Sequence, residues 1–118
     1  MVIYGIKNCD TCKKAIKWLT EHDISFRFHD LRKDGTTTGM VDSWLSKLDH
    51  DLLINKRGTT YRNLEDAEKA TLEGDQKSRL LVESPTLMKR PIFEIGDACL
   101  VGFKGEQQAK LLQLVSSQ

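Results

Sequence analysis

Residues 2–19, VIYGIKNCDTCKKAIKWL, pass from a strand pattern to a helix pattern across a pair of cysteines. Val2-Ile-Tyr4 is a short β-branched and aromatic run, which predicts a first strand. Apolar residues then recur at helical spacing, which predicts a helix over about 11–22 with Asn8 or Cys9 as its cap. The cysteine pair therefore lies where a strand ends and a helix begins.

This position changes the chemistry of the Cys9 thiol. Unpaired backbone N–H groups and the positive end of the helix dipole stabilise a thiolate, so we expect Cys9 to be the nucleophile at neutral pH. Lys7 and Lys13 add positive charge nearby, and Asp10 opposes them. Cys12, about one turn further along, is expected to attack a mixed disulfide on Cys9 and release the product.

The cysteine pair also allows other interpretations. A structural zinc site needs two more ligands, and the chain offers only Cys99 and three histidines without a second paired motif, so no metal is expected. Cys12 could instead be a small buried residue while Cys9 acts alone and passes its mixed disulfide to glutathione or glutaredoxin. Cys99, in a predicted strand beside Leu100 and Val101, is expected to be buried in the core.

The rest of the chain predicts a mixed sheet with a helical insert. Residues 24–28 alternate as a second strand, and Ile92–Ile95 and Ala98–Val101 form a hairpin across Gly96-Asp97, followed by a last helix. Between them we expect a helix with the apolar stripe Met40 to Leu48, a helical turn at Leu52–Ile54, a loop at Lys56–Thr60, and short helices over Leu64–Leu72 and Gln76–Val82 that end before Ser84-Pro85.

This order of elements predicts an α/β, thioredoxin-like fold. Two strands joined by a helix form a right-handed crossover, and the hairpin completes a mixed four-stranded sheet. The helical insert follows the second strand. At 118 residues we expect one domain, with a core of about 1–35 and 88–118 and a helical lobe of about 36–87.

Composition excludes several classes of protein. Hydrophobic residues make up 39% and charged residues 30%, and the formal net charge is +1, so no global attraction to nucleic acid or to an anionic membrane is expected. The N-terminus has no signal-peptide pattern, and no apolar run approaches the length needed to span a bilayer. We therefore expect a cytoplasmic protein. A monomer is also expected, although no feature of the sequence decides the oligomeric state.

Arg90-Pro91 precedes the third predicted strand, opposite the helix that carries Cys9. A cis proline here leaves the preceding backbone able to pair with an extended thiol substrate. Arg90 is then expected to direct its guanidinium towards the thiol or an anionic ligand. The alternative is a trans proline that starts an edge strand beside a solvated arginine.

Four stretches, in the same order, resemble motifs of the arsenate reductase-like family, and the resemblance spans essentially the whole chain. They are YGIKNCDTCKKA at 4–15, NKRGTTYRNL at 55–64, KRPI at 89–92 and VGF at 101–103. The wording is most similar to the YffB-like branch, whose members are regarded as glutathione-dependent thiol reductases. Glutaredoxin-coupled arsenate reductases and the Spx transcriptional regulators are sister branches.

The resemblance implies that Cys9 is the catalytic cysteine and Arg90 the arginine before the cis proline. Cys12 matches the second cysteine of the Spx pattern, where arsenate reductases more often carry serine. Asn55 stands where arsenate reductases place one arginine, and Phe103 where they place another. A site that lacks two of three guanidiniums is expected to bind arsenate poorly.

Arg57, two positions after Asn55, lies in a polar segment that could be only a solvated turn. Gly58 and two threonines nevertheless offer donors beside its guanidinium, which suits an anion. Glutathione carries two carboxylates, so Arg57 and Arg90 are the expected clamps. The same groove is expected to include Thr11, Pro91 and Gly102.

The family resemblance therefore implies a glutathione-dependent thiol/disulfide reductase with Cys9 as nucleophile and Cys12 as resolving thiol. No bound cofactor is expected; glutathione is the co-substrate, and glutaredoxin or thiol proteins are further partners. The alternatives are an Spx-like redox-sensing regulator that contacts RNA polymerase and a glutaredoxin-coupled arsenate reductase. Spx-like chains tend to continue past the last helix, whereas this sequence ends at Gln118, which favours the reductase.

Overall fold

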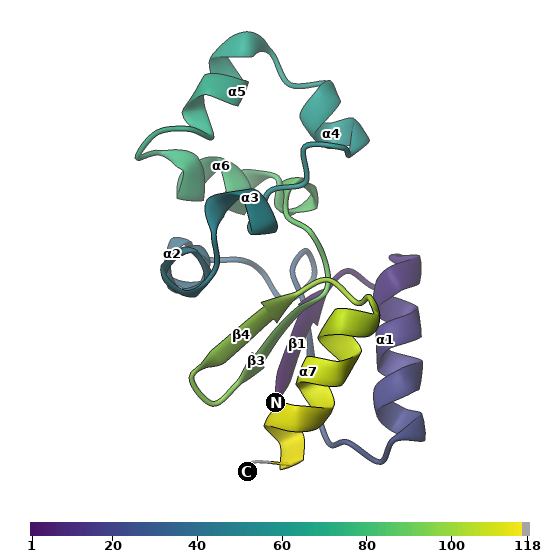
Figure 1. Cartoon of the computed structure of the whole chain (residues 1–118). Coiled ribbons are helices and arrows are strands. Elements are labelled where there is room, and N and C mark those ends of the chain that lie inside the picture. The colour runs from purple at the N-terminus through teal and green to yellow at the C-terminus, as the bar shows by residue number, and fades with distance from the viewer. Residues whose placement is uncertain (117–118) are drawn as a thin grey trace. The chain divides into compact units, whose positions relative to one another are not determined.

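Four short strands pair in the order β2-β1-β3-β4 in a computed structural model that describes residues 1–116 (Figure 1). They are β1 (Val2–Gly5), β2 (Arg27–Asp30), β3 (Ile92–Ile95) and β4 (Ala98–Val101). β1 runs parallel to β2 and antiparallel to β3, and β3 and β4 form an antiparallel hairpin. The predicted mixed four-stranded sheet is confirmed, with β3 and β4 at their predicted residues.

Helices account for most of the remaining chain. They are α1 (Asp10–Glu21), α2 (Thr38–Lys47), α3 (His50–Leu53), α4 (Thr59–Arg62), α5 (Asp66–Thr71), α6 (Lys77–Glu83), the 3₁₀ turn η1 (Pro85–Leu87) and α7 (Gly105–Ser116). None of the helices within residues 1–116 is long and apolar enough to span a membrane.

The chain divides into two compact units. Met1–Asp34 and the chain from Arg90 onward form the first unit, which holds the sheet, α1 and α7. Gly35–Lys89 forms the second unit, which holds α2 to α6 and η1, with one isolated bridge between Ile54 and Met88.

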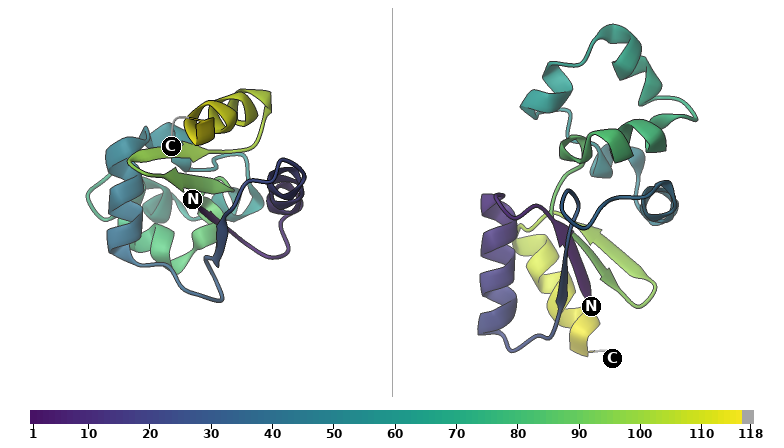
Figure 2. Two further views of the ribbon diagram at one scale, coloured as in Figure 1. Left: turned by 90° about the horizontal axis from the view of Figure 1, so that it is seen from below. Right: turned by 180° about the vertical axis from the view of Figure 1, so that it is seen from behind.

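α1 and α7 pack against one face of the sheet in the first unit, and Figure 2 shows both helices from two further directions. Alternate residues of a strand share a face, so Ile3, Phe93 and Ile95 point to the same side. They meet Ala15 and Leu19 of α1 and a leucine of α7. The fully or nearly buried cluster consists of Ile3, Ala15, Leu19, Phe93, Ile95 and Leu111.

β2 begins three residues later than the alternation at 24–28 predicted. Asp23 adopts a positive φ of 55°, and the N–H of Ile24 donates to the carbonyl of Leu19 at 3.0 Å, so these residues close the end of α1. Ile24 and Phe26 pack on the core without joining the sheet. The apolar alternation therefore reflected packing, while pairing starts only at Arg27, opposite Val2.

The second unit departs from prediction at three points. The helical turn predicted at Leu52–Ile54 is α3 at His50–Leu53, and Ile54 forms the bridge to Met88. Thr59–Arg62 forms the helical turn α4, where a loop was expected over Lys56–Thr60. α5 is shorter than predicted because Glu65 caps it and forms a capping box with Glu68. Pro85 does end α6, and it also opens the 3₁₀ turn η1.

Candidate active site

Cys9, one of the two residues predicted as the cap, is the N-cap of α1. Its N–H donates to the carbonyl of Ile6 at 3.1 Å and closes a turn, and its carbonyl accepts the N–H of Lys13 at 3.0 Å. The side chain is half-buried. The thiol therefore has partial access to solvent at the start of the helix, where backbone N–H groups lack intrahelical partners.

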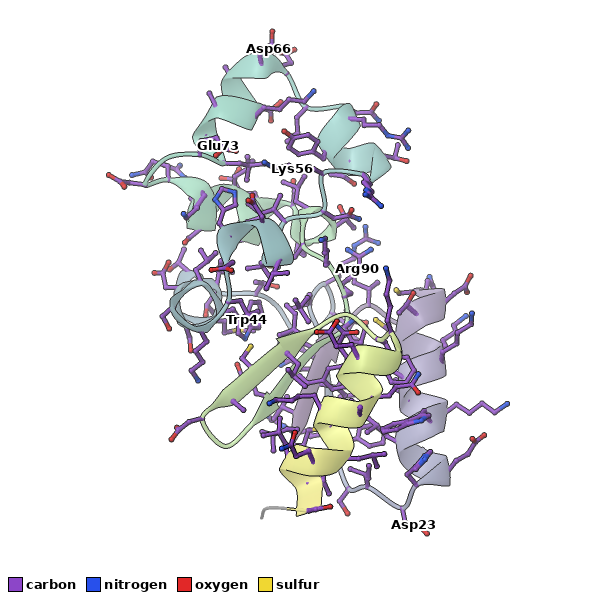
Figure 3. All side chains as sticks on the ribbon, in the orientation of Figure 1. Asp23, Trp44, Lys56, Asp66, Glu73 and Arg90 are labelled. Carbon is purple, nitrogen blue, oxygen red and sulfur yellow. The ribbon has the colours of Figure 1, made fainter. Side chains whose placement is uncertain are left out.

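The pKa of the Cys9 thiol reflects opposing effects. Burial raises it, but the backbone N–H and the thiol of Cys12 and the guanidinium of Arg90 together hold the pKa below the ordinary value. Figure 3 shows Arg90 near the first turn of α1. The groups that gather at Cys9 thus favour its thiolate.

Cys12 has the opposite environment. Its side chain is 1% exposed, and burial, with a smaller contribution from neighbouring Cys9, raises its pKa to about 12. Its Sγ lies close to the backbone of Gly5. A Cβ added at that glycine would stand only 2.5 Å from the sulfur. The pair therefore combines one thiol whose pKa is lowered with one that stays protonated at neutral pH.

Replacing Gly5 with alanine is expected to lower the free energy of unfolding by about 1–3 kcal/mol, because the added methyl group overpacks the Cys12 sulfur. Urea unfolding measures this loss. Gly39→Ala in α2, where the nearest neighbour is 3.9 Å away, is the control and should not destabilise. In a Cys12→Ala background the loss from Gly5→Ala should shrink by at least half; an undiminished loss would contradict the contact.

The Arg90–Pro91 peptide bond is cis, as predicted. The carbonyl of Pro91 accepts the N–H of Gly102 at 2.9 Å, and Gly102 has a φ of 91°, a conformation that favours glycine. Gly102 is thereby fixed beside the start of β3. The structure thus brings Cys9, Cys12 and Arg90 together and holds Pro91 next to Gly102.

Two further substrate contacts were predicted, Thr11 and Arg57. Thr11 is exposed in the first turn of α1. Arg57 is exposed in the second unit, where its N–H donates to Oδ1 of Asn55 at 3.3 Å and Gly58 closes the same turn. Binding of substrate by Thr11, Arg57 and Gly102 stays a prediction.

Cys99 is half-buried, so the prediction of a fully buried core cysteine is wrong. Cys99 pairs with Glu94 across the hairpin, and alternation places both on the sheet face opposite the one that α1 and α7 cover. Tyr4 shares that face and donates its hydroxyl to Glu94 at 3.2 Å. The apolar residues next to Cys99 in the sequence had indicated a core position, and they gave no sign of these polar neighbours across the sheet.

Sequence reasoning missed Asp30 at the end of β2. Asp30 is 7% exposed, yet its carboxylate accepts the N–H groups of Lys7, Arg32 and Lys33. The signal was an aspartate directly after a strand pattern, since aspartate commonly bonds the backbone two or three residues on. Within residues 1–116, no group of three or more His, Cys, Asp or Glu residues is placed to hold a metal ion.

Comparison with known proteins identifies the family to which this chain is similar. The sequence profile of the ArsC family matches residues 4–111. An uncharacterized protein of Haemophilus influenzae is 42% identical over 107 residues, which cover 91% of this chain and 94% of that protein. The Global transcriptional regulator Spx 2 of Lactococcus lactis is 32% identical over 110 residues, which cover 91% of this chain and 82% of the regulator.

A solved structure of a YFFB protein has the same fold. It superposes with a TM-score of 0.83 at 39% identity and covers 92% of this chain and 96% of its own. The mixed sheet and the order of elements are those of a thioredoxin-like fold.

Proposed function

Since this chain belongs to the ArsC family, we propose that it is a glutathione-dependent thiol–disulfide reductase in which Cys9 attacks as a thiolate. The family supports a thiol-based oxidoreductase in general terms. The contrast between the Cys9 thiol, whose pKa is lowered, and the buried Cys12 thiol, whose pKa is about 12, carries the finer proposal. Nucleophilic attack on a disulfide requires a thiol that is both ionised and accessible.

The proposed first step is attack by Cys9 on the disulfide of a substrate R–S–S–R′. The new bond joins Sγ of Cys9 to one substrate sulfur, and the other leaves as R′–S⁻ and takes a proton from water. A glutathione thiolate then attacks the substrate sulfur of the mixed disulfide and restores the Cys9 thiolate. This second step leaves the disulfide G–S–S–R, and a second glutathione thiolate attacks its glutathione sulfur and releases R–S⁻, which takes a proton from water. Overall R–S–S–R′ is reduced by two electrons to two thiols, and two molecules of glutathione are oxidised to one glutathione disulfide.

Cys12 offers a second way to resolve the mixed disulfide. It would attack Sγ of Cys9, release the substrate thiol and leave a Cys9–Cys12 disulfide, which two molecules of glutathione would reduce. Burial is the main cause of the raised pKa of Cys12, and the neighbouring Cys9 sulfur makes a smaller contribution. Only the smaller contribution falls away once Cys9 is in a mixed disulfide, so we expect this route to be slower than direct attack by glutathione.

Turnover of a small mixed disulfide with glutathione, followed through glutathione reductase, tests the proposal. We expect turnover with glutathione and little or none when arsenate and glutaredoxin replace the disulfide. Asn55 and Phe103 stand where arsenate reductases carry guanidiniums, so Asn55→Arg alone should not create arsenate activity. Turnover of arsenate comparable to that of a true arsenate reductase would refute the assignment. RNA polymerase binding without disulfide turnover would favour a regulator like the Spx relative.

A further inference from the structure

Asp30 makes hydrogen bonds to two separate segments of the chain. Its Oδ1 accepts the N–H groups of Arg32 and Lys33 at 2.8 and 2.9 Å, and these bonds close the turn after β2. Its Oδ2 instead accepts the N–H of Lys7 at 3.2 Å, 23 residues away in sequence. One oxygen of the carboxylate therefore serves its own turn, and the other ties down the segment that leads to Cys9.

Lys7 lies inside the turn that Cys9 closes onto Ile6. Ile6, the first residue of the turn, is buried, but the side chains of the two central residues, Lys7 and Asn8, are exposed. Core packing therefore does not hold the backbone at these two positions, and hydrogen bonds must do so. One step earlier, the carbonyl of Gly5 accepts the N–H of Leu31 at 2.8 Å. The end of β2 thus holds the segment before Cys9 at two successive points.

We propose that Asp30 is a positioning residue that holds the turn before Cys9, so that the Sγ of Cys9 faces the Cys12 N–H and Arg90. The proposal rests on the role of Cys9 in the proposed function. Asp30 does not touch the reacting sulfur; it acts through the N–H of Lys7. Loss of that bond releases the turn, and the groups that favour the Cys9 thiolate are then no longer aligned with it.

Other charges face Asp30 and must be separated from this effect. Lys7 belongs to the loop before α1, Lys13 to α1, and Lys33 and Asp34 to the turn after β2; with Asp30 they border a pocket of about 520 Å³. A negative charge near a thiolate raises the pKa of the thiol, so removing the charge alone would make Cys9 ionise more easily. Loss of positioning would instead make Cys9 ionise less easily. The direction in which its titration moves therefore distinguishes the two explanations.

Asp30→Asn is the decisive variant, because asparagine can keep closing its own turn while placing an amide group against the Lys7 N–H. We expect the titration of Cys9 to move to higher pH and its alkylation at pH 6.5 to slow by about tenfold, the value of one charge-assisted hydrogen bond. Rates are read from the Cys9 peptide by mass spectrometry, with circular dichroism showing that the variant is folded.

Asp34→Asn is the matched control. It removes the same charge from the same turn. Asparagine can still accept the N–H of Asp30, as Asp34 does, so the bond from Lys7 to Asp30 stays in place. It should leave the alkylation rate within about twofold of the wild type, because only a screened surface charge changes. Equal slowing in the two variants would overturn the proposal, and so would an unchanged or faster rate in folded Asp30→Asn.

Lys7→Pro keeps the proposal testable if Asp30→Asn does not fold, because proline removes the N–H donor itself. Lys7→Gln removes the same side-chain charge and keeps the N–H, so only the proline variant should slow alkylation; equal rates in the two would contradict the role of the bond. Alkylation needs no turnover, so an inactive wild-type protein would refute the proposed function and leave this inference standing.

Discussion

Replacing Cys9 with serine is expected to reduce kcat/KM for thiol transfer by at least about a thousandfold, because the reaction loses its nucleophile. Serine fits the same N-cap position, so the helix should persist and circular dichroism should be unchanged. Cys99→Ser is the control and should keep full activity, since Cys99 lies on the sheet face away from α1. Activity is followed with a small mixed disulfide and glutathione at pH 7.

The same assignment predicts which cysteine reacts with an alkylating agent. Near pH 6.5 the agent should modify Cys9 first, and the rate should fall as the pH is lowered through the depressed pKa of that thiol. Burial and the raised pKa protect Cys12. A Cys9→Ser protein that retained its activity would exclude Cys9 as the nucleophile, and equal labelling of Cys9 and Cys99 would remove the evidence for a selectively activated thiol.

Arg90→Ala is expected to slow alkylation of Cys9 at pH 6.5 by about tenfold and to move its titration to higher pH. The guanidinium lowers the pKa of Cys9 by a hydrogen bond and by its charge, and alanine removes both. Arg90→Lys should fall between the two proteins because it keeps the charge without the planar fork.

Arg79→Ala is the control for this experiment. Arg79 is exposed on α6 and pairs with Glu83, so its loss should leave the Cys9 titration unchanged. If Arg90→Ala titrates like the wild type, the Cys12 N–H and thiol alone maintain the thiolate, and Arg90 has no part in activating it.

The sequence alone predicted the parts of the fold in which local pattern and pairing agree. Cys9 was placed at the start of a helix because the strand pattern of Val2-Ile-Tyr4 gives way there to helical spacing. The β3–β4 hairpin was predicted at its residues because Gly96-Asp97 is a strong two-residue turn signal. In both places the structure has the element that the local chemistry favours.

Prediction from the sequence failed where contacts between residues far apart in the chain determine the structure. Ile24 and Phe26 alternate like a strand, but their backbone closes α1 and only their side chains follow the pattern. Cys99 has apolar neighbours in sequence, while its neighbours across the sheet are Glu94 and the Tyr4 hydroxyl bound to it. Asp30 resembled an ordinary turn residue. Its bond to Lys7 spans 23 positions, so no pattern in the neighbouring sequence indicates it.

The central claim is that Cys9 is the thiol that takes the substrate sulfur. Mass-spectrometric mapping of the Cys12→Ser variant, after brief exposure to glutathione disulfide at pH 6.5 and an acid quench, tests it most directly. Serine keeps a hydroxyl donor beside Cys9 and removes the second thiol, so the first mixed disulfide is trapped. We predict glutathione on the Cys9 peptide and an unmodified Cys99. Glutathione on Cys99 with Cys9 still a free thiol would contradict the account.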